Sequence, residues 1–522
     1  MKITLSDFTG GDCRERFASA LSFMKDNPGT TLTVEPGVYD LTTARAREAQ
    51  RAVMAGEYGE DPQKVMFTPD YVYDRGLDFK GHVNSTVEAY GATLLVDGFM
   101  EEISIRECSG VTVRGFTVDL KRKPYSKGVV TGFDGGRAVF EFADGITETM
   151  PFLRSAVYSR EKGRLLPRNE CGIGDFRYEG PHRATGVPSA DGVLNEGDEL
   201  YISHVFHGRP AVLIEEAENT LLEDITIHTH PGMGVTAFHA TNVTVDRLRV
   251  VPSVGEHFST TTDATHFASC RGLVRLDGCE FDGQGDDSIN VHTYYYSICE
   301  RDGRTVTLEV RAPDGTHTQK TDCPQKGDRM ELTEASSCAP LDTYRVEEAA
   351  VIGENKCRVT LDREPPEYLG GMLFADPDQV PRVEFVNCKA RNHFARSVLI
   401  KSREALIENC EFSDVFELGV KVAAESGWAE GINSESVTVR NCRFYNNGRR
   451  YDICGGIAVY MDAEVKKRAH GTVVIEDNEI VCPKCEHGII VEDTKRAVLR
   501  RNRVVSRGEP IVVGEGVEAV TE

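Results

Sequence analysis

The chain has 522 residues, and its 83 acidic side chains outnumber its 60 basic ones, which gives a net charge of −23. This charge argues against nucleic acid or an anionic membrane as a partner and weighs against a polyanionic substrate such as pectate. No apolar run approaches the roughly 20 residues that span a bilayer. The first residues also lack the pattern of an export signal, so we expect a cytoplasmic protein unless a leader was removed.

The first forty residues read as a cap. Apolar residues at positions 17–23 predict a short amphipathic helix, and residues 31–34 predict a strand. Residues 42–57 are rich in alanine, arginine and glutamate, which favours a second helical segment. We therefore expect helices only near the start of the chain, before strands take over.

A short unit then recurs from about residue 103 onward. Each copy has an alternating strand that often ends in Asn-Cys, followed by a second short strand. The copies that end at Cys388, Cys410, Cys442, Asn478 and Asn502 are separated by 22, 32, 36 and 24 residues. A period near 22–24 with short strands is typical of a β-solenoid, in which parallel strands of successive coils stack about 4.8 Å apart. The prediction is an all-β, right-handed parallel β-helix.

Two stretches break this period and read as antiparallel β-structure with Asp-Gly and Gly-Asp turns. We predict two β-barrel-like insertions there. The chain then divides into a cap with the first coils (1–120), insertion one (121–201), the coils that carry the candidate site (202–296), insertion two (297–382) and the C-terminal coils (383–522).

Cysteines and histidines could also indicate disulfides or a metal. Fifteen cysteines are an odd number, and several fall inside strand-like runs, which favours reduced, buried thiols. The single pair Cys482 and Cys485 favours packing at a turn over a zinc or redox motif, and the spacing of His228, His230 and His239 matches no strong zinc pattern. We predict no disulfide, no metal and no cofactor.

The candidate site lies between residues 260 and 296. Asp263 stands in Thr-Thr-Asp-Ala-Thr-His, and Asp286 and Asp287 stand in Gly-Asp-Asp-Ser-Ile-Asn-Val-His, with Asp263 23 residues before Asp286. One coil separates these positions, so the three carboxylates are expected to be spatial neighbours, as acid–base catalysis requires. A plain Gly-Asp turn and a calcium site are the alternatives. The Asp pair leads directly into a strand, and the nearby histidines are poor calcium ligands.

Further residues of the same coils could orient sugar hydroxyls through their donors and acceptors. His266, Asn290 and His292 belong to the site strands themselves. Counting from the turn at Cys388 as from Cys279 places Arg396 beside Asp287 and Lys401 beyond it. The same count from Cys410 places Glu417 in phase with Asp286.

The motifs around Asp263 and Asp286-Asp287 resemble those of the inverting right-handed β-helix glycosidases of the polygalacturonase type. The local sequence of the two motifs resembles glycoside hydrolase family 110 more closely. Members of that family are exo-acting α-1,3-galactosidases, some of which cleave the blood-group B antigen. The resemblance implies that Asp286 is the general acid and that Asp263 and Asp287 activate water. The Gly-His-Gly of the polygalacturonases is missing, and only Ile400-Lys401 remains of their Arg-Ile-Lys.

The expected function is an exo-acting, inverting hydrolase of terminal α-1,3-linked galactose with an oligosaccharide or glycoconjugate as partner, and the sequence leaves a homodimer open. The alternatives are a related glycosidase for another sugar, a glycan-binding adhesin that uses the same groove, and a calcium-dependent lyase.

Overall fold

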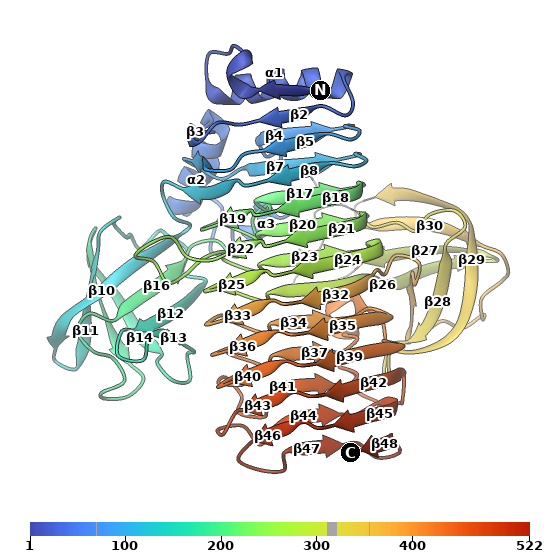
Figure 1. The fold of residues 1–522 in the computed structure, drawn as a ribbon. Coiled ribbons are helices and arrows are strands. Elements are labelled where there is room, and N and C mark those ends of the chain that lie inside the picture. The colour runs from blue at the N-terminus through green and yellow to red at the C-terminus, as the bar shows by residue number, and fades with distance from the viewer. Residues whose placement is uncertain (69, 311–320, 354) are drawn as a thin grey trace.

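The computed structural model describes residues 1–68, 70–310, 321–353 and 355–522. Within them the chain winds into a tall parallel β-helix, with the N-terminal residues at one end and the C-terminal residues at the other (Figure 1). Each coil contributes one strand to each of three parallel sheets that enclose a continuous core. The predicted all-β, parallel β-helix fold is confirmed.

The first sheet has thirteen strands, in the order β1 (Lys2–Thr4), β2 (Thr31–Thr33), β5 (Thr86–Glu88), β8 (Thr112–Arg114), β18 (Glu218–Glu223), β21 (Thr241–Asp246), β24 (Arg271–Asp277), β32 (Arg382–Val386), β35 (Glu404–Glu408), β39 (Ser436–Arg440), β42 (His470–Glu476), β45 (Thr494–Arg500) and β48 (Glu518–Thr521).

The second sheet has eleven strands, in the order β3 (Gly37–Asp40), β6 (Ala92–Val96), β9 (Thr117–Leu120), β19 (Thr226–Ile227), β22 (Arg249–Val250), β25 (Glu280–Asp282), β33 (Lys389–Arg391), β36 (Glu411–Ser413), β40 (Arg443–Tyr445), β43 (Glu479–Val481) and β46 (Arg503–Val505).

We call the third sheet the site sheet, because the candidate site lies where its strands begin. Its strands are β4 (Arg75–Lys80), β7 (Glu101–Arg106), β17 (Val212–Glu215), β20 (Val235–Phe238), β23 (Thr265–Ala268), β26 (Ile289–Asp302), β34 (Val398–Ile400), β37 (Val420–Val422), β41 (Cys454–Val459), β44 (His487–Val491) and β47 (Ile511–Val513).

The recurrent Asn-Cys pair marks one corner of the coil. Asn387, Asn409 and Asn441 adopt φ values of 56°, 57° and 54°, a left-handed conformation that asparagine tolerates better than most residues. The cysteine that follows turns inward, and Cys388 and Cys410 are both buried. The pair therefore repeats because the corner needs a left-handed residue followed by a small apolar one.

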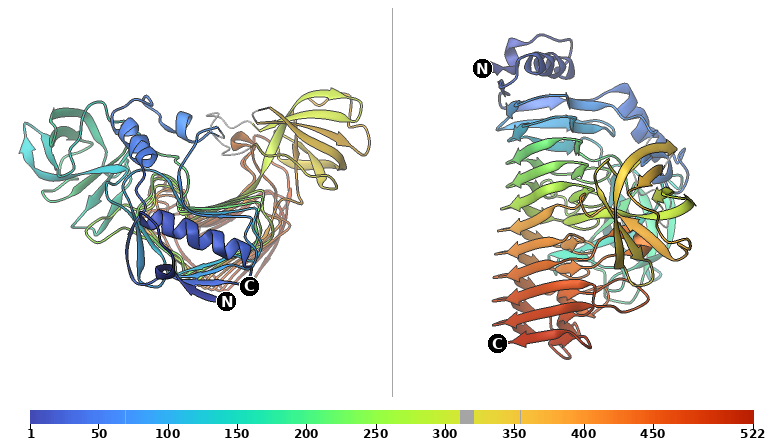
Figure 2. Two further views of the ribbon diagram at one scale, coloured as in Figure 1. Left: turned by 90° about the horizontal axis from the view of Figure 1, so that it is seen from above. Right: turned by 90° about the vertical axis from the view of Figure 1, so that its right-hand side faces the viewer.

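The N-terminal cap covers the open end of the core (Figure 2). Helix α1 (Cys13–Asp26) begins at Asp12, whose side chain accepts a hydrogen bond from the backbone of Glu15 at 2.8 Å. It buries Phe17 and Leu21 against the first coils. Covering the end prevents edge-to-edge pairing with another chain. The other helical segments are α2 (Ala44–Met54), α3 (Gln63–Met66) and the 3-10 turns η1 (Leu5–Asp7) and η2 (Ser426–Trp428).

The two insertions diverge to either side of the site sheet (Figure 2). The first is an antiparallel sheet of seven strands, in the order β13 (Arg164–Leu166), β12 (Arg154–Ser159), β16 (Glu199–Ser203), β10 (Tyr125–Asp134), β11 (Arg137–Phe142), β15 (Arg183–Pro188) and β14 (Ile173–Gly180).

The second insertion grows out of the long strand β26 and closes on itself. Antiparallel pairings run from β26 to β27 (Thr305–Val310), β30 (Lys356–Leu361), β29 (Ala339–Gly353), β28 (Arg329–Glu334), β31 (Met372–Ala375) and back to β26. This closed ring is the barrel that the sequence predicted, whereas the strand order of the first insertion runs from β13 to β14 as a sheet.

The state of the cysteines can be tested directly. All fifteen are free thiols in this structure, and Cys299 is the exposed one. Denatured, unreduced protein is therefore expected to release close to fifteen thiol equivalents to a colorimetric reagent, and native protein about one. A denatured count near one would contradict the absence of disulfides.

Candidate active site

The register between neighbouring coils decides which carboxylates face one another. Strands β23 and β26 pair in parallel with Thr265 opposite Ile289, and the backbone N–H of Ala264 donates to the carbonyl of Asp287 at 2.8 Å. Asp263 therefore stacks on Asp287. The expectation that Asp263 and Asp286 share a phase was wrong by one residue, because the coil between them is 24 residues long at this level.

A tight turn places adjacent aspartates in the same hollow. Residues 283–288 lie between β25 and β26, so Asp286 and Asp287 precede the strand and escape its alternation of faces. A Cβ atom on Gly285 would lie 2.1 Å from the carbonyl oxygen of Thr261 on the preceding coil. Glycine is needed here because the two turns touch backbone to backbone.

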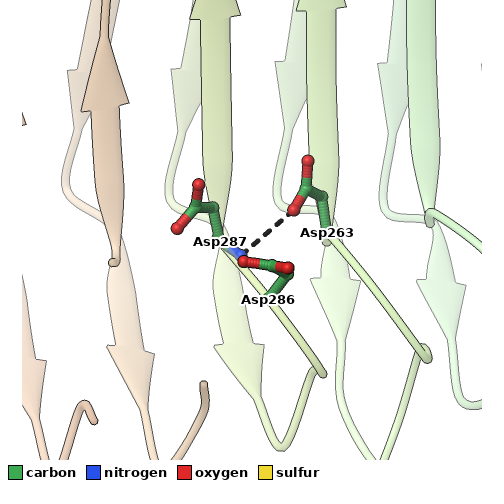
Figure 3. Close-up of side chains that lie close together, drawn as sticks. All are labelled: Asp263, Asp286 and Asp287. Carbon is green, nitrogen blue, oxygen red and sulfur yellow. Dashed lines mark hydrogen bonds between the residues drawn. The ribbon is translucent and has the colours of Figure 1, made fainter. Parts of the chain in front are cut away.

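The three carboxyl groups form a compact cluster (Figure 3). One oxygen from each of Asp263, Asp286 and Asp287 can be chosen so that all lie within 4.8 Å of one another. The backbone N–H of Asp287 donates to Oδ1 of Asp263 at 3.1 Å, and Oδ2 of Asp263 lies 2.7 Å from Nδ1 of His266. Both oxygens of Asp287 accept from Arg396, one from its backbone at 2.8 Å and one from its guanidinium at 2.9 Å.

Burial and mutual repulsion perturb two of these carboxyls. Burial raises the pKa of Asp263 well above its usual range, and the charge of Asp286 adds to the rise. Burial likewise raises the pKa of Asp287, although the Arg396 guanidinium opposes it. Asp286 is the most accessible of the three, with 22% of its side chain exposed against 7% for Asp263 and 2% for Asp287. Burial thus favours a proton held within the cluster.

A pocket of about 620 Å³ opens over this cluster. Among the predicted site residues it is lined by Asp263, Asp286, Asp287, His266, Asn290, His292, Arg396 and Glu417. Arg396 continues the stack of Asp287, and Glu417 lies in phase with Asp286, as the count along the coils predicted.

The sequence predicted that Lys401 contacts the substrate. Its side chain is instead fully buried and does not line the pocket. Strand β38 (Glu430–Gly431) pairs with β26 and folds over it. The Lys401 ammonium donates to Glu425 at 2.8 Å, to Glu430 and to Asn290 at 3.2 Å. Lys401 therefore holds the floor of the pocket in place.

Several pocket residues could not be found from the coil pattern. Arg154 comes from β12 of the first insertion and stacks over Phe206 with its guanidinium carbon 4.1 Å from the ring centroid. Its nitrogen lies 3.8 Å from a carboxylate oxygen of Asp286. Trp428, the last residue of η2, and Tyr451 also line the pocket. Only the single tryptophan offered a compositional signal.

The other histidines lie in separate environments. Nε2 of His230 is 3.1 Å from Oε2 of Glu102. His239 contacts Asp322, which also accepts hydrogen bonds from Ser269 at 3.0 Å and Tyr296 at 2.8 Å. His228 faces the carbonyl of Val251 at 3.0 Å. These contacts explain the three residues as hydrogen-bonded structural groups.

Three carboxylates this close could also hold a cation. However, both oxygens of Asp287 accept from Arg396, and both oxygens of Asp263 have partners in His266 and the backbone. Calcium takes six to eight oxygen ligands, about 2.3–2.6 Å away. The hydrogen-bond pattern therefore fits acid–base chemistry better than a calcium cage.

The fit at Gly285 predicts a specific loss of stability. Alanine there must push the Thr261 carbonyl away, and overpacking of this kind costs about 1–3 kcal/mol. Gly285→Ala should melt earlier in a calorimetric scan. Gly174→Ala is the control, because its Cβ would meet only the Val187 carbonyl, 3.8 Å away. Equal melting temperatures for the two variants would contradict the close approach.

The raised pKa of Asp263 predicts how stability depends on pH. The folded state keeps its proton above the pKa of the unfolded chain, so stability is lost as pH rises from about 4 through the raised pKa. Asp263→Asn cannot ionise and should be more stable than the parent at pH 7, with the difference vanishing near pH 4.

The matched control has the opposite sign. A hydrogen bond from Arg247 lowers the pKa of Asp224, which lies on the surface. Asp224→Asn should lose a little stability at neutral pH, within the about 0–1 kcal/mol of an exposed pair. Urea denaturation at both pH values measures the two effects. Lower stability of Asp263→Asn at pH 7 would contradict the burial argument.

A family model described as "Right handed beta helix region" matches residues 372–521. The alpha-1,3-galactosidase A of Bacteroides fragilis is 24% identical over 96% of this chain and 86% of its own length. The alpha-1,3-galactosidase A of Shewanella woodyi is 26% identical over 87% of this chain and 78% of its own.

Among solved structures, the A-module of the mannuronan C-5 epimerase AlgE4 from Azotobacter vinelandii covers all of both chains with 11% identity and a TM-score of 0.45. In the part of the chain that the structure describes, no helix is long and apolar enough to cross a membrane. The chain is a right-handed β-helix protein and a relative of the α-1,3-galactosidases A and B over most of its length, which confirms the resemblance that its sequence predicted.

Proposed function

We propose that this protein is a glycoside hydrolase that releases terminal α-1,3-linked galactose from glycans by a single displacement with inversion. The observation that carries this proposal is the cluster of Asp263, Asp286 and Asp287 within 4.8 Å at the base of a pocket. The names of the relatives support the choice of galactose and of the linkage.

Accessibility and hydrogen bonding support the division of roles. Asp286 is the most exposed carboxyl and points into the pocket, so it acts as general acid toward the glycosidic oxygen. Asp263 and Asp287 are held by fixed donors and lie on adjacent coils. Two oxygens up to 4.8 Å apart can both accept hydrogen bonds of about 2.8 Å from one water molecule.

The stereochemical part of the proposal rests on the resemblance and on these hydrogen bonds. Carboxyl pairs of inverting glycosidases stand roughly 6.5–9.5 Å apart. One oxygen from each carboxyl group lies within 4.8 Å of the others, which is nearer than that spacing. Both oxygens of Asp287 are occupied by Arg396, which disfavours Asp287 as a covalent nucleophile.

The pocket favours action on a chain end. Two lining residues come from segments outside the β-helix coils: Phe67, beside α3, and Arg154, from the first insertion. Two more, Trp428 and Tyr451, come from later coils. Walls from separate segments restrict a continuous glycan from running through. A terminal sugar fits this shape, which supports exo action.

The charges favour a neutral sugar over a uronate, the substrate of the polygalacturonase alternative. A uronate carboxylate needs a cation that is not already paired. Every lysine and arginine that lines the pocket, among the described residues, faces a carboxylate: Arg154 faces Asp286, Arg209 faces Glu101, Arg396 faces Asp287, Lys421 faces Glu425 and Arg450 faces Glu417.

The proposal is tested with purified protein and three defined substrates: linear α-1,3-galactobiose, the fucosylated blood-group B trisaccharide and an oligogalacturonide. We expect free galactose from one or both galactosides and no product from the uronide. Proton NMR of the first turnovers should show β-galactose. Initial α-galactose would refute inversion, and tight binding without turnover would support the adhesin alternative.

Asp286→Asn is expected to lower kcat by roughly 10³-fold, within the range of general acid catalysis. The fall in kcat should be smaller for a substrate with an activated aryl leaving group, which needs less protonation. Asp282→Asn is the matched control, because Asp282 precedes the turn and lies outside the pocket lining. Full activity in Asp286→Asn would refute the assigned acid.

A further inference from the structure

Two histidines form a bridge from the carboxylate cluster to the pocket floor. Nε2 of His266 lies 2.8 Å from Nε2 of His292, and the ring planes stand at 89°. Nδ1 of His266 lies 2.7 Å from Oδ2 of Asp263, and Nδ1 of His292 lies 3.1 Å from the carbonyl oxygen of Thr293. The contacts make one continuous chain.

The geometry determines how many protons this chain holds. A carbonyl oxygen only accepts, so Nδ1 of His292 carries a proton. A second proton must lie between the two Nε2 atoms, and a third between His266 and Asp263. An ionised carboxylate with two neutral imidazoles would hold one fewer. The additional proton can reside on Asp263, His266 or His292 without movement of any heavier atom.

The far end of the chain meets a carboxylate with a fixed counter-ion. Oε1 of Glu430 lies 3.7 Å from Nε2 of His292, and Oε2 accepts from the buried ammonium of Lys401. Oε2 also lies 3.4 Å from the amide nitrogen of Asn290. Asp286, Asp287 and Arg396 also face the chain at the Asp263 end, Tyr294 lies beside the His292 ring, and Glu425 pairs with Lys401.

We propose that His266 and His292 form a proton relay that starts at Asp263, with the Glu430 carboxylate beside its far end. The relay rests on the proposed hydrolysis. The water oxygen bonds to the anomeric carbon, the glycosidic bond breaks, and the departing oxygen takes its proton from Asp286. The chain enters the reaction with the two protons of an ionised Asp263 and two neutral imidazoles. One proton of the water passes to Asp263 and on through His266 toward His292, which brings the chain to three protons. After the products leave, one proton returns from Asp263 to Asp286, whose carboxylate oxygen lies within 4.8 Å, so both groups regain their starting state.

The sequence predicted that these two histidines contact the substrate directly. Their burial favours a relay instead. Only 1% of the His292 side chain and 11% of the His266 side chain are exposed. Both ring nitrogens of each histidine already take part in contacts of the chain. Little of either residue is left to bind a hydroxyl group.

The test uses the full-length protein with His292→Gln. Glutamine keeps a polar atom near the position of Nε2 but cannot take up a proton. We expect kcat to fall roughly 10²-fold with KM nearly unchanged, the acidic limb of the pH–rate profile to move to higher pH, and added imidazole to restore part of the rate. His82→Gln is the control, since His82 is equally buried against Ser85. Its kinetics should match the parent.

A second variant and a spectroscopic measurement separate the possible outcomes. His266→Asn keeps a hydrogen-bond donor toward Asp263 but removes the contact with His292. It should therefore show the same fall in kcat as His292→Gln and the same partial recovery with added imidazole. Nitrogen-15 NMR of labelled histidine should show the shared Nε2 proton in the parent and in Asp286→Asn, and its loss in His292→Gln. An unchanged pH profile, or a raised KM at constant kcat, would overturn the relay. A parent that cleaves no galactoside but shows the shared proton would overturn the proposed function instead.

Discussion

The parallel register between neighbouring coils is the constraint on which the site depends. The backbone N–H groups of one coil donate to the coils on both sides of it, so a residue can move only by sliding the whole strand. A slip of one position would turn every inward side chain outward and expose the core. This cost holds Asp263, Asp287 and Arg396 in one column, with Glu417 in the neighbouring column of Asp286. The packing of apolar side chains in the core therefore fixes the relative positions of the candidate catalytic groups.

The same stack tolerates an unusual density of buried charge. Lys401 is fully buried between Glu425 and Glu430, and Lys421 pairs with Glu425 at 2.6 Å. Buried ion pairs of this kind rarely stabilise a fold more than apolar residues of similar size would. The interiors of the coils beneath the pocket are themselves apolar, with Ile289, Val398 and Ile400 in the continuous core. The charged floor is therefore better explained by the pocket than by the stability of the helix.

The first insertion helps to turn one face of the site sheet into an enclosed site. A solenoid face alone offers an open groove, as strands of equal length stack without recesses. The first insertion supplies Arg154 to the pocket, and its Tyr125 packs edge to face on Phe258 at 5.4 Å between ring centroids. The second leaves the helix through β26, the strand that also carries Asn290 and His292. Both insertions are thus anchored on coils beside the carboxylates, but among the described residues only the first, through Arg154, lines the pocket.

The sequence by itself determined the repeating part of this protein. Short alternating strands and the Asn-Cys corner recur along the chain, so local chemistry was enough to predict the parallel helix and its interruptions. Counting from Cys388 and Cys410 also placed Arg396 and Glu417 correctly, since those coils have the same length between corner and strand.

Only the tertiary structure decided which side chains meet where the period fails. The partner of Asp263 was displaced by one residue because its coil differs in length by one. Lys401 was buried by β38, and Arg154 reached Asp286 from an insertion 131 residues upstream of Gly285, whose carbonyl it also contacts. Periodicity encodes contacts between successive coils. The docking of a loop or an insertion depends on its own fold and on the surface that it meets, and no repeat in the sequence records either.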